Sequence, residues 1–305
     1  MAGSSLQQNA LMRDALLATA IRQEKRLGTF VESSAPEGKT TRIKLFNTGV
    51  ITKLGILVTA NVTVGTANAT LSPKAPWNII DQLKLTDFEG TDRVNLSGFQ
   101  LFMLNSVRER TPAFINNEGL AGVSTLPAVP VAQATQDLKF YVEVPLAYDA
   151  ERDLRGAIYA QTAVGEMFLN IKWNGDFHVN GSDDGVYNGA ATTTCVVNSI
   201  SAEVTQHYLF PQSVQGMIPI PQADLLTVYE LNGNLRVTDN LSNGQERLIS
   251  YPNVRSVVGM YVNWMNNGIM ANTISDFRLI ANGNNVLIER SNEAQLQTQR
   301  KWING

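Results

Sequence analysis

The sequence contains one cysteine and two histidines in 305 residues, and this scarcity excludes several classes of site. Cys195 has no second cysteine with which to form a disulfide within the chain. His178 and His207, even with that cysteine, are too few for a four-ligand zinc site or a three-histidine metal site. We therefore predict no metal, no cofactor, structural histidines, and a small buried apolar side chain at Cys195.

Charged residues are also scarce, at 17% of the chain against about 25% in an average soluble protein. The net charge of −3 gives no general attraction to phosphate backbones, so we expect no specific nucleic-acid partner. No apolar run approaches the roughly 20 residues that cross a bilayer. Hydrophobic residues still make up 44%, and valine, threonine and asparagine are common, which favours a core of strands joined by turns.

Motifs for phosphate or metal binding are incomplete. Residues 38–40 match the end of a phosphate-binding loop, but its first glycine would stand at Ser33, and a strand pattern follows. Asp183 and Asp184 lie in a loop with too few acidic oxygens for a full calcium site. The paired carboxylates of a sugar-cleaving enzyme depend on tertiary positions, so an enzyme built on a β-sandwich is disfavoured only by the absence of a motif.

Residues 5–27 carry a long helical pattern. Ser5 and Gln8 suit a capping box at its start, and Gly28 suits the position that ends a helix. The segment has a net charge of +2, while the rest of the chain is acidic. Apolar residues at three- or four-residue spacing predict an amphipathic helix with a packing face that includes Leu6, Ala10, Leu17 and Ile21.

Strand patterns follow a linker rich in Ser, Pro and Gly at residues 33–38. Ser97 is predicted to cap a short helix at 99–107. Residues 211–221 hold three prolines, which donate no ladder hydrogen bond, and so predict a junction between domains. The strand patterns cover residues 41–46, 50–64, 79–86, 93–96, 138–144, 166–173 and 195–209.

A faint internal repeat crosses this junction. Residues 50–61 resemble 254–266 and residues 80–96 resemble 274–288, with a helical pattern after each at 99–107 and 292–302. The conserved order of elements predicts two duplicated β-domains. Because the second domain stops at its helical pattern, we expect either a native chain longer by about ninety residues or strands supplied by another chain.

Residues 142–161 carry the most specific pattern. A strand ends in Val144, Pro145, Leu146, Ala147 and Tyr148, an acidic turn follows, and Asp153, Leu154 and Gly156 precede the next strand. This stretch closely resembles the major capsid proteins of the tectiviruses, in which these elements occur in the same order. The resemblance extends to residues 49–64, to 218–229 and to the N-terminal helix, and so covers nearly the whole chain.

The resemblance implies an all-β fold of two jelly-roll β-sandwiches side by side, with an N-terminal amphipathic α-helix. Together with the strand pattern it predicts an N-terminal helix and arm at 1–32, a first jelly roll at 39–210, the Pro-rich junction at 211–221 and a second jelly roll at 222–305. In such a fold most strand edges are paired inside the sheets, and subunit contacts can bury the remaining edges.

The function that the resemblance implies is that of a structural major capsid protein of a bacteriophage, and not of an enzyme. Three copies would form a pseudo-hexagonal homotrimer, and trimers would tile an icosahedral virion shell over an internal membrane after assembly in the host cytoplasm. Neighbouring trimers and minor capsid or vertex proteins are further expected partners. Anionic lipid would meet the inner face of the shell through the basic residues of the N-terminal segment: Arg13, Arg22, Lys25 and Arg26.

Two alternatives stay open at this point. A glycan-binding β-sandwich module would share the fold class, because such folds carry many activities. A minor spike or vertex protein of the same virus class would share part of the resemblance.

Overall fold

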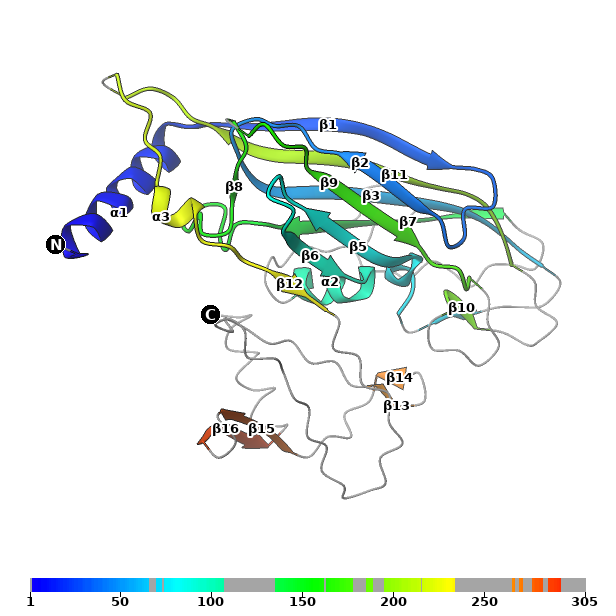
Figure 1. The fold of residues 1–305 in the computed structure, drawn as a ribbon. Helices are drawn as coiled ribbons and strands as arrows, with labels where there is room; N and C mark the ends of the chain where they lie inside the picture. The colour runs from blue at the N-terminus through cyan, green and yellow to red at the C-terminus, as the bar shows by residue number, and fades with distance from the viewer. Residues whose placement is uncertain are drawn as a thin grey trace.

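Two β-sheets lie face to face in the computed structural model of this chain, and a helix extends from one end of them (Figure 1). The mainly β class and the N-terminal helix predicted from the sequence are confirmed. The structure describes residues 2–65, 70–72, 74–106, 135–161, 163–177, 185–188, 195–214, 216–233, 265–266, 269–270, 276–281 and 285–291.

The first sheet has the strand order β1-β11-β3-β7, with antiparallel neighbours throughout. Alternate residues of these strands face the core, as the pleat of a strand requires. The strands are β1 (Ile21–Glu32), β11 (Cys195–Phe210), β3 (Val50–Val64) and β7 (Thr135–Pro145), and the short β8 (Ile158–Tyr159) pairs with the start of β3.

The second sheet has the order β12-β6-β5-β9-β2. Its strands are β12 (Leu231–Asn232), β6 (Asp92–Leu96), β5 (Ile80–Thr86), β9 (Phe168–Trp173) and β2 (Thr40–Lys44). β12 is parallel to β6, and the other neighbours are antiparallel. A separate pair consists of β4 (Thr70–Leu71) and β10 (Tyr187–Asn188).

The main core lies between the inner faces of the two sheets. Ile56 and Val58 of β3 and Leu169 and Ile171 of β9 are fully buried there. Trp173 is buried with its indole nitrogen donating to Thr41 Oγ1 at 2.9 Å, so its polar atom is satisfied. The arrangement is that of a β-sandwich.

Most of the first sandwich matches the sequence prediction. Strands are found at each of the seven predicted places, and the helix α2 (Gly98–Leu104) follows the predicted cap. Ser97 Oγ accepts from the backbone N–H of Gln100 at 3.2 Å, and Gln100 Oε1 accepts from the backbone N–H of Ser97 at 2.9 Å. This reciprocal capping box fixes where the helix begins.

The N-terminal helix is shorter than predicted. α1 spans Ala2–Thr19, so the helix already includes Ser5 and ends well before Gly28. From Ile21 the chain is a strand paired with β11, and Gly28 lies at a register shift in that pairing. Pairing with a long central strand overrides the helical spacing of residues 21–27. None of the described helices is both long and apolar enough to cross a membrane.

Asn105, which follows α2, covers part of the outer edge of β7. Its side chain donates to the carbonyl of Glu143 at 2.7 Å and accepts from the N–H of Glu143 at 2.8 Å. An exposed strand edge can pair with a strand of another molecule. Asn105 therefore blocks such pairing at Glu143.

The chain after the Pro-rich segment returns to the first sandwich. α3 (Gln222–Leu225) contacts α1, and β12 joins the second sheet. Residues 222–232, which the prediction placed in the second jelly roll, therefore pack on the first. The division into two jelly rolls stays a prediction.

After residue 233 the structure describes two hairpins. They are β13 (Met265–Asn266) with β14 (Ile269–Met270), and β15 (Asp276–Ala281) with β16 (Asn285–Ser291). The second hairpin stands where the internal repeat places a copy of β5 and β6. The rest of the repeat, including residues 254–264 and 292–302, lies outside the described residues, as do Asp183 and Asp184.

Candidate functional site

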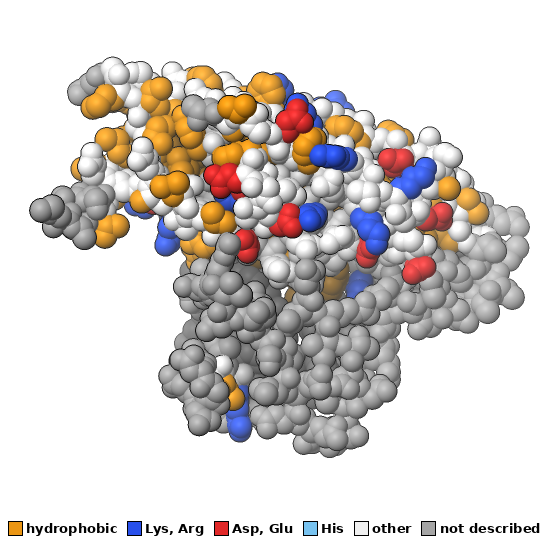
Figure 2. All heavy atoms as spheres, in the orientation of Figure 1, with side chains coloured by type: hydrophobic (Ala, Val, Ile, Leu, Met, Phe, Trp, Pro, Cys, Tyr) orange, Lys and Arg blue, Asp and Glu red, His pale blue; other side chains and the backbone are white. Residues whose placement is uncertain are grey.

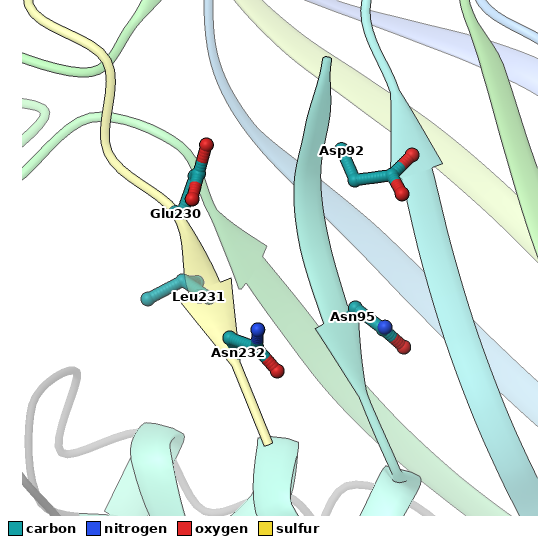
Figure 3. A pocket seen from close by; sticks show the side chains of 5 residues that line it. All are labelled: Asp92, Asn95, Glu230, Leu231 and Asn232. Carbon is teal, nitrogen blue, oxygen red and sulfur yellow. The ribbon is translucent and has the colours of Figure 1, made fainter. Parts of the chain in front are cut away.

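A polar hollow of about 240 Å³ lies where β12 joins β6, and Figure 3 shows the side chains of Asp92, Asn95, Glu230, Leu231 and Asn232 around it. The Asp92 carboxylate lies 2.9 Å from Lys84 Nζ, and this contact lowers the pKa of Asp92. Across the described ranges, no three His, Cys, Asp or Glu side chains gather as metal ligands would. We assign the hollow no chemical role.

Cys195 is partly buried at the start of β11 and packs against the main core. Burial raises the pKa of its thiol to about 12, with a smaller effect of Glu37. The side chain is therefore a neutral thiol at physiological pH, as an apolar role requires. His178 lies outside the described residues.

His207 belongs to a row of side chains on the outer face of the first sheet. Its Nδ1 lies 3.1 Å from Glu24 Oε1 of β1, and Lys53 of β3 is its register partner on the other side. Lys53 Nζ in turn donates to Glu143 Oε1 of β7 at 2.9 Å. Burial lowers the pKa of His207 more than the two carboxylates raise it, so the imidazole is neutral at neutral pH.

Replacing His207 with glutamine is expected to make stability less sensitive to mild acid. The pKa is lowered from 6.5 in the folded chain, so below about pH 6.5 the unfolded chain takes up a proton that the folded chain does not. As the pH decreases below this value, the free energy of unfolding therefore decreases by at most about 1.4 kcal/mol per pH unit. Urea unfolding between about pH 5.5 and 7.5 measures this slope. His178 is present in both the native protein and the variant, so it contributes equally to both slopes. An equal slope in the variant would contradict the lowered pKa assigned to His207.

The tectivirus-like motif folds into a tight loop between β7 and β8. Tyr148 N–H donates to the carbonyl of Arg155 at 2.8 Å, and Asp149 and Asp153 form an isolated bridge between these two residues. The Arg155 guanidinium binds both carboxylate oxygens of Asp153 and holds the pKa of that carboxyl below its usual range. The acidic turn of the motif thus closes the loop on itself.

Apolar residues of the motif pack into both cores. Val144 and Leu146 belong to the main core, whereas Ala147 and Leu154 belong to a second, smaller core, and Pro145 ends β7. Leu154 and Ala147 pack with residues from β3, β11 and α1: Val50, Leu209 and Leu16. We call the place where the motif, α1 and residues 222–229 meet the motif end of the sandwich.

Gly156 joins the motif to the chain that follows the junction. Its N–H donates to the carbonyl of Thr227 at 3.1 Å. Its φ is +88°, and a Cβ there would lie 2.4 Å from Tyr229 Cδ2 and 2.5 Å from the carbonyl oxygen of Leu146. The Tyr229 ring also lies 5.8 Å from the ring of the half-exposed Tyr148. The motif glycine is needed because two backbones and an aromatic ring converge on it.

The four basic residues proposed for lipid contact lie on two elements. Arg13 lies in α1 and the other three lie in β1, and each has a partner in its own chain. The partners are Asp224 at 3.6 Å from Arg13, Glu151 at 3.2 Å from Arg22, Glu203 at 2.7 Å from Arg26, and the Phe46 ring, whose centroid is 3.1 Å from Lys25 Nζ. The three carboxylates offset part of the positive charge of the arginines, whereas Lys25 keeps its charge.

Within its own chain the helix packs with only part of the face predicted from its sequence. Leu6 is 68% exposed, and Ile21 belongs to β1 rather than to α1. Ala10 is partly buried, and Leu17 packs against the second core, in which Leu16 is fully buried. The reason is the direction of the helix, since its first turns extend away from the sheets (Figure 1).

Exposed hydrophobic side chains gather at the motif end, where Figure 2 shows them over α1 and the neighbouring chain. Residues 211–221 contain no charged residue. Contiguous apolar surface of this kind marks contacts with other proteins or membranes. The exposed side chains are Leu6, Leu11, Ile21, Val214, Met217, Ile218, Leu226 and Val228.

Sequence reasoning missed three residues of the motif end. Asn9 hydrogen-bonds to Asp224, and Tyr229 packs on Gly156. Asp224 in a helical turn after Pro221 is a weak local signal. Nothing local connects it to Asn9, because the two are 215 residues apart.

Comparison with known proteins shows similarity to a family of capsid proteins. The family model described as "P3 major capsid protein N-terminal" matches residues 30–210. The major capsid protein P3 of Enterobacteria phage PRD1 is 28% identical over 225 residues, which cover 68% of this chain and 56% of that protein. This chain therefore spans little more than half the length of the curated relative that it matches.

Comparison with solved structures finds weaker similarity. The crystal structure of the STIV MCP has a TM-score of 0.41 and 16% identity, over 65% of this chain and 55% of that chain. The major capsid protein P2 from bacteriophage PM2 has a TM-score of 0.31 and 10% identity, over 62% of this chain and 51% of that chain.

Proposed function

Because this chain belongs to the family of P3 major capsid proteins, we propose that it is a structural major capsid protein and not an enzyme. The observation that carries the proposal is the family match, which runs from the end of β1 to the end of β11. The matched span includes the motif from Val144 to Gly156. A β-sandwich alone would not favour one function over another.

The proposed assembly is a homotrimer of two-sandwich subunits, and trimers tile an icosahedral shell. The exposed hydrophobic side chains of the motif end support it, because a neighbouring copy can bury them. Asn105 supports it too, since a protected strand edge favours defined side-chain contacts over strand addition. In a closed symmetric assembly such contacts repeat without open-ended growth.

We further propose that the shell encloses a membrane, that minor capsid or vertex proteins complete it, and that it assembles in the host cytoplasm. Arg22 and Arg26 support lipid contact, since their side chains are 58% and 60% exposed despite their carboxylate partners. Each basic residue near anionic lipid contributes about 1 kcal/mol. The helix Ala2–Thr19 stands beside them at the N-terminal end of β1.

The purified chain is expected to form a homotrimer with three times its mass of 33.4 kDa. Size-exclusion chromatography with light scattering measures this mass. Leu11→Lys is expected to weaken association between copies by about tenfold, because it places a charge in exposed apolar surface. Val196→Lys is the matched control, because Val196 is also exposed, at 57%, but lies at the start of β11, far from the motif end. A monomer that binds glycans would contradict the proposed function and favour a sugar-binding module.

A further inference from the structure

α1 is held to the rest of its chain at two places. Near its end, Leu16 is fully buried in the second core. Two turns earlier, Asn9 contacts α3. Its Nδ2 donates to Asp224 Oδ1 at 2.8 Å, and its Oδ1 accepts from the backbone N–H of Ala223 at 2.9 Å. One asparagine side chain therefore bonds both the backbone and a carboxylate of α3.

The contact completes α3, which is a single turn. Pro221 precedes this turn and has no side-chain group that caps it. The first N–H groups of a helix have no partner within the helix, so Asn9 supplies from α1 the acceptor that a capping residue ordinarily supplies.

Asp224 depends on α1 for its polar partners. It is 5% exposed, so its carboxylate needs hydrogen bonds or an opposite charge. Asn9 bonds one carboxylate oxygen, and Arg13, one helical turn further on, lies 3.6 Å from the other. The three side chains form a single polar contact between α1 and α3, which we call the latch: Asn9, Arg13 and Asp224.

α3 is itself tied to the motif. The N–H of Thr227 donates to the carbonyl of Asp224 at 3.1 Å, and the carbonyl of Thr227 accepts from Gly156 at 3.1 Å. Leu225 packs against the second core. A continuous series of contacts thus runs from the motif through α3 to the first half of α1.

We propose that Asn9 and Asp224 are positioning residues that set the direction of α1. When the latch is broken, residues 6–13 separate from α3, while Leu16 keeps the end of the helix in the second core. The exposed Leu6 and Leu11 lie on or before the latched turn, so the latch determines where this apolar surface points. The role of this surface in contacts between copies rests on the proposed function, whereas the latch itself lies within a single chain.

Hydrogen–deuterium exchange of the full chain tests the latch. Asn9→Ala is expected to speed amide exchange in residues 6–13 by roughly tenfold, with no change in β1 or β3. Alanine has the higher helix propensity, so intrinsic helix stability would act in the opposite direction. Gln8→Ala, an exposed neighbour on the same turn, is the matched control and should leave exchange unchanged or slower.

Exchanging the two side chains gives a second, independent test. Asn9→Asp places two carboxylates together and should speed exchange in residues 6–13 more than Asn9→Ala does. The double variant Asn9→Asp with Asp224→Asn restores a donor and an acceptor and should return exchange to within about twofold of the native rate. Unchanged protection in Asn9→Ala, or no recovery in the double variant, would overturn the latch. Either failure leaves the trimer measurement, and hence the proposed function, untouched.

Discussion

Replacing Gly156 with alanine is expected to destabilise the first sandwich by about 2–4 kcal/mol. The φ of +88° strains any residue with a Cβ. The added Cβ would also lie 2.4 Å from Tyr229 Cδ2 and 2.5 Å from the carbonyl oxygen of Leu146. The carbonyl belongs to the buried motif loop and cannot move alone, so the chain after the junction is forced away. Urea unfolding, followed by intrinsic fluorescence, measures the loss.

Gly90→Ala is the matched control for this substitution. Gly90 has a similar φ of +82°, but no atom lies within 4 Å of the position of its Cβ. Only the backbone strain of about 1–2 kcal/mol is expected there. The difference between the two variants isolates the contact with Leu146 and Tyr229. Equal losses would mean that the close packing at the motif glycine contributes nothing to stability.

Asp87→Ala is expected to cost about 3–5 kcal/mol, because it leaves a buried guanidinium without its partner. Asp87 and Arg93 are 3% and 6% exposed, and Arg93 Nε donates to Asp87 Oδ2 at 2.6 Å. Asp87 Oδ1 also accepts from the backbone N–H groups of Glu89 and Thr91, at 3.0 and 2.9 Å. The variant therefore loses the ion pair and the hydrogen bonds that shape the β5–β6 turn.

Asp92→Ala, on the same hairpin, is the control for burial, because it also removes a carboxylate from an ion pair but at an exposed position. Asp92 pairs with Lys84 at 2.9 Å, but both side chains are more than 40% exposed. Such a pair contributes about 0.5 kcal/mol, so this variant should unfold almost as the native protein does. Replacing both buried partners, with Asp87→Ala and Arg93→Met, should cost less than Asp87→Ala alone. Similar losses from Asp87→Ala and Asp92→Ala would refute the role given to burial.

The parts of the fold that were predicted correctly depend on neighbouring residues. The strand pattern at residues 50–64 coincides with β3, because alternating apolar residues mark a strand with one buried face. Ser97 and Gln100 mark the start of α2, since both halves of a capping box lie three residues apart. The motif from Val144 to Gly156 could be recognised as a continuous stretch before its contacts were known.

The parts that were predicted wrongly depend on distant residues. Residues 21–27 have helical spacing, yet Ile21 pairs with Phe210 and the strand continues to Glu32. Ile21 was placed on the packing face of the helix, but the chain has already turned into β1 at this residue, and Leu6 at the other end of α1 is exposed. The acidic and aromatic partners of the basic residues come from β11, from α3 and from loops elsewhere in the sequence.

The β class, the start of α2 and the motif could be predicted from the sequence, because alternation, a capping box or a continuous stretch of residues marks each of them locally. The contact of Gly156 with Tyr229 and the hydrogen bond of Asn9 with Asp224 become apparent only in the folded chain. Both contacts join residues that the chain separates by 73 and 215 positions. They exist because the register of β11 against β1 and β3, and the return of the chain after residue 221, bring the motif, α1 and α3 to the same end of the sandwich.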